Sequence, residues 1–186
     1  LLKKQTKYLL DSGVQGLFIC GGTGEGAYLK TEEKKQVLNT IKNIAGGSVF
    51  LCAALINSNT RAVIEEMKEI EVCEPDYIVA TAPYYHAASQ EDIYEHYRVI
   101  GEKSRIPVIV YNIPSTTHNY IEPETIKKIS AMENIAGVKD SSGNFMNFTR
   151  GLFARTDKKF AWIQGEDYLC GATFLAGGDG VVSGLS

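Results

Sequence analysis

The chain has 186 residues, of which 44% are hydrophobic and 22% charged, and its formal net charge is −3. This composition is typical of a soluble globular protein with one sizeable core. The charged residues form no basic stripe, which disfavours a nucleic-acid partner. The longest apolar run, residues 49–56, is too short to span a membrane. Four scattered cysteines without a C-x-x-C motif predict reduced thiols in a cytoplasmic protein, and the three histidines lack metal-ligand spacing. We therefore expect neither a metal ion nor a cofactor.

Short apolar runs alternate with helical segments along the whole chain. In chain order the pattern predicts a helix over 1–12, a strand over 14–20, a helix over 31–45, a strand over 48–54, a helix from 58 or 59 to 72, a strand over 76–81, a helix over 89–104, and strands over 107–111, 135–139, 160–164 and 180–183 with helices between them. Thr31, Ser58 or Asn59, and Ser89 are the expected N-caps, and Pro123 fits the first turn of a further helix.

The seven predicted strands are continuously apolar, which indicates a parallel sheet covered by helices. Repeated β–α units of this kind form either an eight-stranded (β/α)₈ barrel or an open doubly wound sheet. Seven strands are one short of a barrel, and the chain does not begin with methionine. We therefore expect residues 1–186 to be one barrel domain that is incomplete at both ends.

Lys139 stands at the end of a predicted strand, in the segment NIAGVKDSSG. Active sites of barrels are built at the carboxyl ends of the strands. An amine that leaves an apolar strand there loses solvation, so its pKa falls and its neutral form can attack a ketone to form an imine. The alternative interpretation is a strand-end lysine that extends to water, with Asp140 as an ion-pair partner.

Two further features lie at the same predicted edge. Tyr111 ends the strand over 107–111, where its phenol can carry protons to and from an imine, although such a residue is also typical of a core. The loop GGTGEG, residues 21–26, offers backbone N–H groups for a carboxylate or phosphate, or is a plain glycine turn. A dinucleotide-binding loop is disfavoured, because the helix begins only near Thr31 and the next strand does not end in an acid.

Together these segments resemble the dihydrodipicolinate synthase / N-acetylneuraminate lyase family of class I, pyruvate-dependent aldolases. The segments that carry the resemblance run in the family's order and cover nearly the whole chain: CGGTGEG, APYYHAASQEDIYEHY, VIVYNIPSTT, NIAGVKDSSGN and GEDYLCGATFLAGGDGVVS. The most specific pair is Y-N-I-P and G-V-K-D, in which Tyr111 precedes Lys139 by 28 residues. The resemblance implies a complete (β/α)₈ barrel followed by C-terminal helices, so we expect this chain to lack the first strand and those helices.

The resemblance also implies roles for single residues and an assembly. Lys139 is the Schiff-base lysine, Tyr111 is the proton relay, and Tyr85 reaches into the site of a neighbouring subunit. The implied binding residues are Gly22, Thr23 and Gly24 for the pyruvate carboxylate, Val182 beside pyruvate, and Gly165 and Asp167, next to Glu166, for substrate hydroxyls. A homo-oligomer, either a dimer or a tetramer, is expected, with pyruvate and an aldehyde or 2-oxo acid as substrates.

Two departures from the family pattern bear on the reaction. Gly22 stands where many members have a threonine or serine whose hydroxyl links the relay tyrosines, so that this link is missing here unless water or Thr23 supplies it. Thr116 stands where the dihydrodipicolinate synthases have an arginine, and threonine cannot make the bidentate contact with an aldehyde's carboxylate. We therefore expect a lyase that releases pyruvate from a sugar acid or related 2-oxo acid, of the N-acetylneuraminate lyase or 2-keto-3-deoxy-sugar-acid aldolase type. The dihydrodipicolinate synthase reaction of lysine biosynthesis is one alternative, and a non-catalytic binding relative is the other.

Overall fold

The computed structural model describes residues 1–156 and 159–184 of the chain. Seven strands form one sheet in chain order, and every neighbouring pair is parallel. The strands are β1 (Gly16–Ile19), β2 (Phe50–Leu55), β3 (Tyr77–Thr81), β4 (Val108–Asn112), β5 (Ile135–Asp140), β6 (Ala161–Gln164) and β7 (Gly180–Val181). The predicted strands and the parallel α/β class are therefore confirmed, and β7 is shorter than the predicted 180–183.

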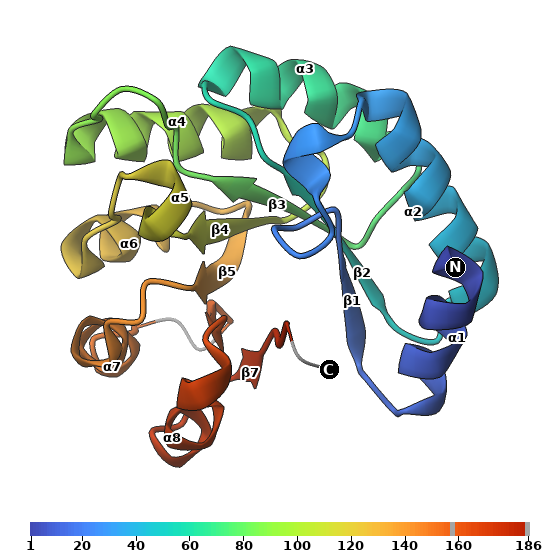
Figure 1. Ribbon diagram of the computed structural model, residues 1–186. Helices are drawn as coiled ribbons and strands as arrows, with labels where there is room; N and C mark the ends of the chain where they lie inside the picture. The colour runs from blue at the N-terminus through green and yellow to red at the C-terminus, as the bar shows by residue number, and fades with distance from the viewer. Residues whose placement is uncertain (157–158, 185–186) are drawn as a thin grey trace.

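Helices connect the strands and lie around the outer side of the sheet, which curls so that β7 turns back toward β1 (Figure 1). They are α1 (Leu2–Asp11), α2 (Thr31–Ala45), α3 (Thr60–Glu71), α4 (Gln90–Lys103), α5 (Pro114–Thr117), α6 (Pro123–Ile129), α7 (Phe145–Phe153) and α8 (Cys170–Leu175), with two 3-10 turns, η1 (Gly26–Tyr28) and η2 (Asp167–Leu169). In the described residues β1 and β7 are the two edges of the sheet. The barrel expected from the sequence is thus present as an open, curled, seven-stranded sheet.

Helix starts follow local capping chemistry, with one exception to the predictions. Asn59 caps α3 and Ser89 caps α4, as expected. The predicted cap at Thr31 is wrong, because Thr31 is the first residue of α2 itself. The carboxylate of Glu33 instead accepts a hydrogen bond from the backbone N–H of Lys30 (2.8 Å). A carboxylate three residues further on therefore satisfies the N–H group at this helix start.

Successive residues of a strand face opposite sides of the sheet, so each strand contributes to two cores. The outer, helix-covered face holds most of the buried side chains, such as Ile78, Val110 and Val138. The concave face carries a smaller buried cluster, formed by Ala54, Val79, Ile109 and Tyr111. This concave face is the one that a barrel would enclose.

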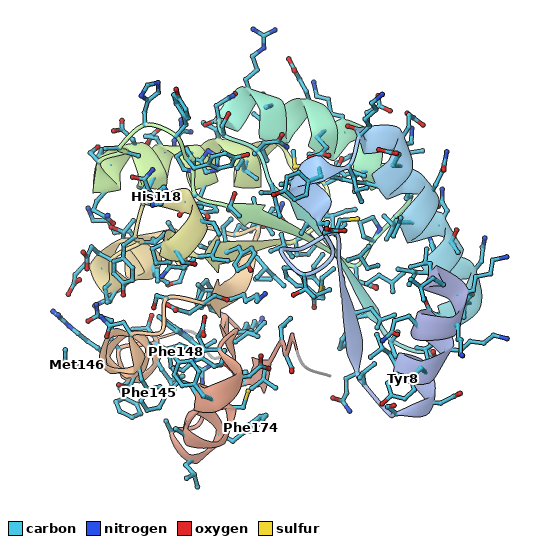
Figure 2. All side chains as sticks on the ribbon, viewed as in Figure 1. Tyr8, His118, Phe145, Met146, Phe148 and Phe174 are labelled. Atoms are coloured by element: carbon cyan, nitrogen blue, oxygen red, sulfur yellow. The ribbon has the colours of Figure 1, made fainter. Side chains whose placement is uncertain are left out.

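Helix α7 illustrates how the outer core is packed (Figure 2). Phe148 is buried with its ring centroid 5.6 Å from that of Trp162 on β6, and Phe145 stacks beside it at 6.0 Å. Met146 points away from the sheet and is exposed. A β-carbon on Gly151 would lie 2.0 Å from the Trp162 indole, so α7 needs a glycine at this contact. These contacts hold α7 against the strand that follows Lys139 in the sheet.

Candidate active site

Lys139 lies on the concave face near the end of β5, in register with Tyr111 of β4 and Ile163 of β6. Its side chain is buried at 7% exposure. The Nζ atom lies 4.1 Å from the centroid of the Phe18 ring on β1 and 4.2 Å from that of Tyr111. The amine is therefore enclosed by two aromatic rings, and the interpretation of Lys139 as a lysine that extends to water is wrong.

Burial lowers the pKa of Lys139 from its ordinary 10.5 to about 8, although the nearby charges of Glu166, Asp167 and Cys52 act in the opposite direction. At pH 7 about one amine in ten is then neutral and nucleophilic. The neighbouring Asp140 has other partners, since its carboxylate accepts hydrogen bonds from the Asn112 amide (3.1 Å) and the Ser142 N–H (2.8 Å). The amine is thus tuned by loss of water rather than by a paired carboxylate.

Tyr111 is buried beside this amine, with its ring edge-on to Phe18 at a centroid distance of 5.6 Å. Burial raises the pKa of the Tyr111 phenol, a hydrogen bond with Ser141 opposes that rise, and the charge of Glu166 adds to it. The phenol is therefore protonated near neutral pH. Such a group can donate a proton to a reacting oxygen and take one back.

The glycine-rich loop after β1 folds tightly on itself. The N–H of Glu25 donates to the carbonyl oxygen of Gly22 (3.0 Å). A β-carbon on Gly26 would lie 1.7 Å from the carbonyl oxygen of Cys20, so no larger residue fits. The N–H groups of residues 22–24 donate to no other described residue. This exposed turn therefore presents free backbone donors of the kind that bind carboxylates.

The loops after β1, β6 and β7 meet at one rim of the concave face. A β-carbon on Gly184 would lie 3.4 Å from the Thr23 hydroxyl oxygen and 3.7 Å from a carboxylate oxygen of Asp167. The N–H of Val182 donates to the carbonyl oxygen of Gln164 (2.8 Å), which extends the pairing of β7 with β6. The curl of the sheet thus gathers three of the predicted binding residues, although their strands are far apart in the sequence.

Tyr85 and Thr116 lie apart from this group. Tyr85 is 86% exposed with a left-handed backbone (φ 83°), and its ring packs against His86 at 4.9 Å. Thr116 is exposed in α5, where its hydroxyl donates to the carbonyl oxygen of Ile113 (3.2 Å). In the described part of this single chain, neither side chain contacts Lys139.

Several residues around the amine escaped the sequence analysis. The sequence pattern predicts Phe18 as an ordinary strand residue. Nothing in its neighbouring residues indicates that its ring contacts Lys139 across the sheet. Ser141 could have been found, because period-two alternation places it on the same face as Lys139. Gly165 is brought to this group, but as packing space: a β-carbon there would lie 2.0 Å from the Ser141 hydroxyl oxygen and 2.9 Å from Cε of Lys139.

Among the described residues, no group of three or more His, Cys, Asp or Glu side chains is placed to hold a metal ion. No helix in the same residues combines the length and apolar character needed to cross a membrane. The four cysteines are free thiols, and Cys20 and Cys73 are buried, in line with the prediction of reduced thiols.

Comparisons with known proteins point to one family. The family model described as "Dihydrodipicolinate synthetase family" matches residues 1–186. A curated 4-hydroxy-tetrahydrodipicolinate synthase of Listeria innocua is 37% identical over 177 residues, which are 95% of this chain and 60% of that protein. The chain spans about 60% of the length of the curated relatives it matches.

Two solved structures show the same likeness. The chloride-inhibited dihydrodipicolinate synthase of Acinetobacter baumannii in complex with pyruvate matches with a TM-score of 0.93 and 30% identity, over 98% of this chain and 62% of that one. The 2-keto 3-deoxygluconate aldolase of Picrophilus torridus matches with a TM-score of 0.90 and 33% identity, over 98% and 65%. With the model of the family matched from the first residue to the last, the chain belongs to the dihydrodipicolinate synthetase family.

Proposed function

We propose that the protein containing this chain is a class I aldolase that binds pyruvate as a Schiff base on Lys139. The observation that carries the proposal is the buried amine of Lys139, which loses solvation between the rings of Phe18 and Tyr111 at the carboxyl end of β5. A lysine with a pKa of about 8 in a pocket of this kind has the property that imine chemistry needs. A non-catalytic binding relative gains nothing from a buried amine that loses solvation, so we favour the enzyme.

The reaction uses Lys139 as nucleophile and Tyr111 as proton carrier. The lone pair of the neutral amine attacks the C2 carbonyl carbon of pyruvate, and a proton passes from the nitrogen to the carbonyl oxygen to give a carbinolamine. Tyr111 donates its phenol proton to that hydroxyl, which leaves as water while the nitrogen lone pair forms the C=N bond. The phenolate then takes a proton from the C3 methyl group, which converts the iminium into an enamine.

The enamine carbon forms the new C–C bond. It attacks the carbonyl carbon of an aldehyde, and the resulting oxyanion takes the proton from Tyr111. Water then adds to the iminium carbon and gives a proton to the Tyr111 phenolate, and the carbinolamine collapses to the 2-oxo product and the free amine of Lys139. Thr23 and the free N–H groups of residues 22–24 hold the pyruvate carboxylate throughout, and Val182 lines the pyruvate site. Gly165 leaves room for the lysine side chain, and the same steps in reverse describe cleavage.

We propose that further chain completes this sheet to a (β/α)₈ barrel. Support comes from the relatives, which are longer than this chain, and from the open edges β1 and β7. We also propose a homo-oligomer, a dimer or a tetramer, in which Tyr85 enters the site of a neighbouring subunit. Its high exposure in the single chain leaves the ring available for that role.

For the second substrate, the names of the relatives favour the alternative reaction over the one expected from the sequence. The curated relatives are 4-hydroxy-tetrahydrodipicolinate synthases, so we propose condensation of pyruvate with aspartate semialdehyde. Cleavage of a sugar acid remains the second candidate for two reasons. Thr116 takes the place of the carboxylate-binding arginine, and the aldolase of Picrophilus torridus is among the similar structures.

The first experiment treats the full-length protein with pyruvate and borohydride. We expect mass spectrometry to find a reduced pyruvyl group on the peptide that contains Lys139. The rate of trapping should rise with pH through about 8, because the reactive form is the neutral amine. Lys139→Arg should give no adduct, since the guanidinium stays protonated. An adduct on another lysine, or none at all, would overturn the proposal.

A second assay separates the two candidate reactions. The kcat/KM for condensation with aspartate semialdehyde is compared with that for pyruvate release from a panel of sugar acids. We expect the condensation to have the higher kcat/KM, in agreement with the names of the curated relatives. The opposite ranking would establish the sugar-acid lyase in its place.

A further inference from the structure

The proposed chemistry leaves the proton relay of this chain without an assigned hydroxyl. Tyr111 must hold a negative charge for part of each cycle, and an isolated buried phenolate is costly. Position 22, where the resemblance expects a hydroxyl, is a glycine on an exposed turn. We therefore searched the concave face for another hydroxyl that can stabilise the Tyr111 oxygen.

Ser141 lies where such a group is needed. It follows Lys139 by two residues, so both side chains face the concave side. The residue is buried at 8% exposure, and its N–H donates to the carbonyl oxygen of Asn112 (2.8 Å), which continues the pairing of β4 with β5 beyond the strand end. The Ser141 side chain is also near enough to the phenol to act on the pKa of Tyr111, which it lowers. The backbone that carries this hydroxyl is thus held firmly beside the Tyr111 strand.

Gly165 shows that the Ser141 hydroxyl also borders the reacting amine. The ideal β-carbon position of Gly165 lies 2.0 Å from the Ser141 oxygen and 2.9 Å from Cε of Lys139. The N–H of Gly165 donates to the carbonyl oxygen of Asp140 (2.8 Å), which fixes this backbone against β5. The hydroxyl and the end of the lysine therefore meet in space that exists because residue 165 has no side chain.

The charges around Tyr111 make this hydroxyl distinctive. Burial and the carboxylate of Glu166 both disfavour the phenolate and raise the pKa of Tyr111. The hydrogen bond with Ser141 acts in the opposite direction. A hydroxyl can donate to the phenolate and, by rotating, accept from the phenol, so it can serve both protonation states.

We propose that Ser141 is the hydroxyl partner of Tyr111 in the proton relay and does here what a side chain at position 22 does in other members. The assignment rests on the proposed function. Ser141 donates its hydrogen bond to the Tyr111 oxygen after the phenol proton has passed to the carbinolamine hydroxyl, and it keeps its own proton. It is a positioning residue that acts through Tyr111, and Gly165 keeps the space for it.

The test uses pyruvate alone, so that it does not depend on the identity of the aldehyde. Exchange of the pyruvate methyl hydrogens for deuterium requires the enamine and can be followed by NMR in the full-length protein. We expect Ser141→Ala to lower kcat for exchange by about 10- to 100-fold, the range for one hydrogen bond to a charged group, with little change in KM. Ser141→Thr, which retains the hydroxyl, should recover most of the rate. The pH limb set by Tyr111 should move to higher pH in the alanine variant.

Two controls separate a relay from a packing effect. Ser142→Ala removes a neighbouring hydroxyl that accepts from the Asn144 N–H (3.1 Å), and we expect it to leave exchange unchanged. In a Tyr111→Phe background, Ser141→Ala should cost less than about threefold, because its partner is already gone. The same loss with and without the phenol would show a structural role and overturn the assignment, as would an unchanged rate for Ser141→Ala.

Borohydride trapping distinguishes this proposal from the function on which it rests. Ser141→Ala should still form the pyruvyl adduct on Lys139, because its amine is untouched. If wild type forms the adduct and the alanine variant exchanges at the wild-type rate, the relay assignment is wrong and the aldolase stands. If wild type forms no adduct, the aldolase proposal itself has failed.

Discussion

The two faces of the sheet differ in whether their buried polar side chains have hydrogen-bond or ion-pair partners. On the helix-covered side, Lys34 and Glu66 form an ion pair at 2.6 Å, and the Asn57 amide donates to the same carboxylate at 2.6 Å. The ring nitrogens of His96 are both occupied, by the Thr60 hydroxyl at 2.8 Å and the Thr81 carbonyl oxygen at 3.1 Å. Buried polar groups on this side are therefore paired with each other, and these pairs connect neighbouring helices and strands.

The concave side leaves its polar groups incomplete. In the described residues the Thr81 hydroxyl is a buried side-chain oxygen without a hydrogen-bond partner. The Lys139 amine has aromatic rings beside it where an ion-pair partner would be. Because a half-satisfied buried group lowers stability, such groups persist where a ligand or a reaction uses them. Alternate residues of the same strands thus divide between stability and chemistry.

Removing the phenol from the concave side should have the largest effect. Tyr111→Phe keeps the ring that shields Lys139 and removes only the hydroxyl. We expect kcat for pyruvate methyl exchange to fall by about 10²–10⁴-fold with a small change in KM. An unchanged kcat would show that Tyr111 is part of the packing and not of the relay.

Breaking a completed pair on the outer side should instead unfold the protein. Lys34→Met leaves the Glu66 carboxylate buried without its cation, so we expect the free energy of unfolding to fall by about 3–5 kcal/mol. Urea denaturation measures the loss. The double variant Lys34→Met/Glu66→Leu should recover most of it, and a tolerated single variant would contradict the comparison.

Removing the buried amine of Lys139 should instead make the folded chain more stable. The pKa of Lys139 falls from 10.5 to about 8 on folding, so below pH 8 the folded chain carries a charge that burial disfavours. Lys139→Met should therefore raise the free energy of unfolding at pH 7 by roughly 3 kcal/mol while abolishing the adduct.

The pH dependence of this gain in stability tests whether burial of the charge is its cause. Between pH 8 and 10.5 the unfolded chain binds more protons at Lys139 than the folded chain, so the wild type gains stability as pH rises. The advantage of the methionine variant should shrink over the same interval. An advantage that is equal at pH 7 and pH 10 would mean that burial of the charge is not its origin.

The smallest effect concerns the single hydroxyl of Thr81. Thr81→Val keeps the shape of the side chain and removes a buried oxygen that has no hydrogen-bond partner. We therefore expect the free energy of unfolding, measured by thermal denaturation, to rise by about 1 kcal/mol. Thr117→Val is the matched control, because the buried Thr117 hydroxyl has hydrogen-bond partners. It donates to the carbonyl oxygens of Ile113 and Asn119, each at 3.1 Å. Thr117→Val should lower the free energy of unfolding by a similar amount. If both variants changed it in the same direction, the interpretation would be refuted.

Local sequence patterns left three points undecided: one helix cap, the surroundings of Gly165 and the second substrate. The cap at Thr31 was misplaced by one residue, because Lys30 is the N-cap of α2 and its N–H donates to the Glu33 carboxylate. Gly165, for which the resemblance implies substrate contact, also leaves space for Ser141 and Lys139 of β5. The preference for a sugar acid followed mainly from Thr116, whereas the names of the curated relatives favour the alternative reaction. The helix cap is decided by residues within one turn of Thr31, whereas the surroundings of Gly165 come from another strand.

The sequence by itself determined the seven apolar runs, the parallel α/β class and the position of Lys139 and Tyr111 at strand ends, because these follow from local patterns. It also contained the alternation that places Ser141 on the face of Lys139. Only the tertiary structure decided that Phe18 of β1 covers an amine on β5, with a pKa of about 8 as the result. Those two strands are not neighbours in the sheet, so their contact depends on the curl accumulated over the strands between them.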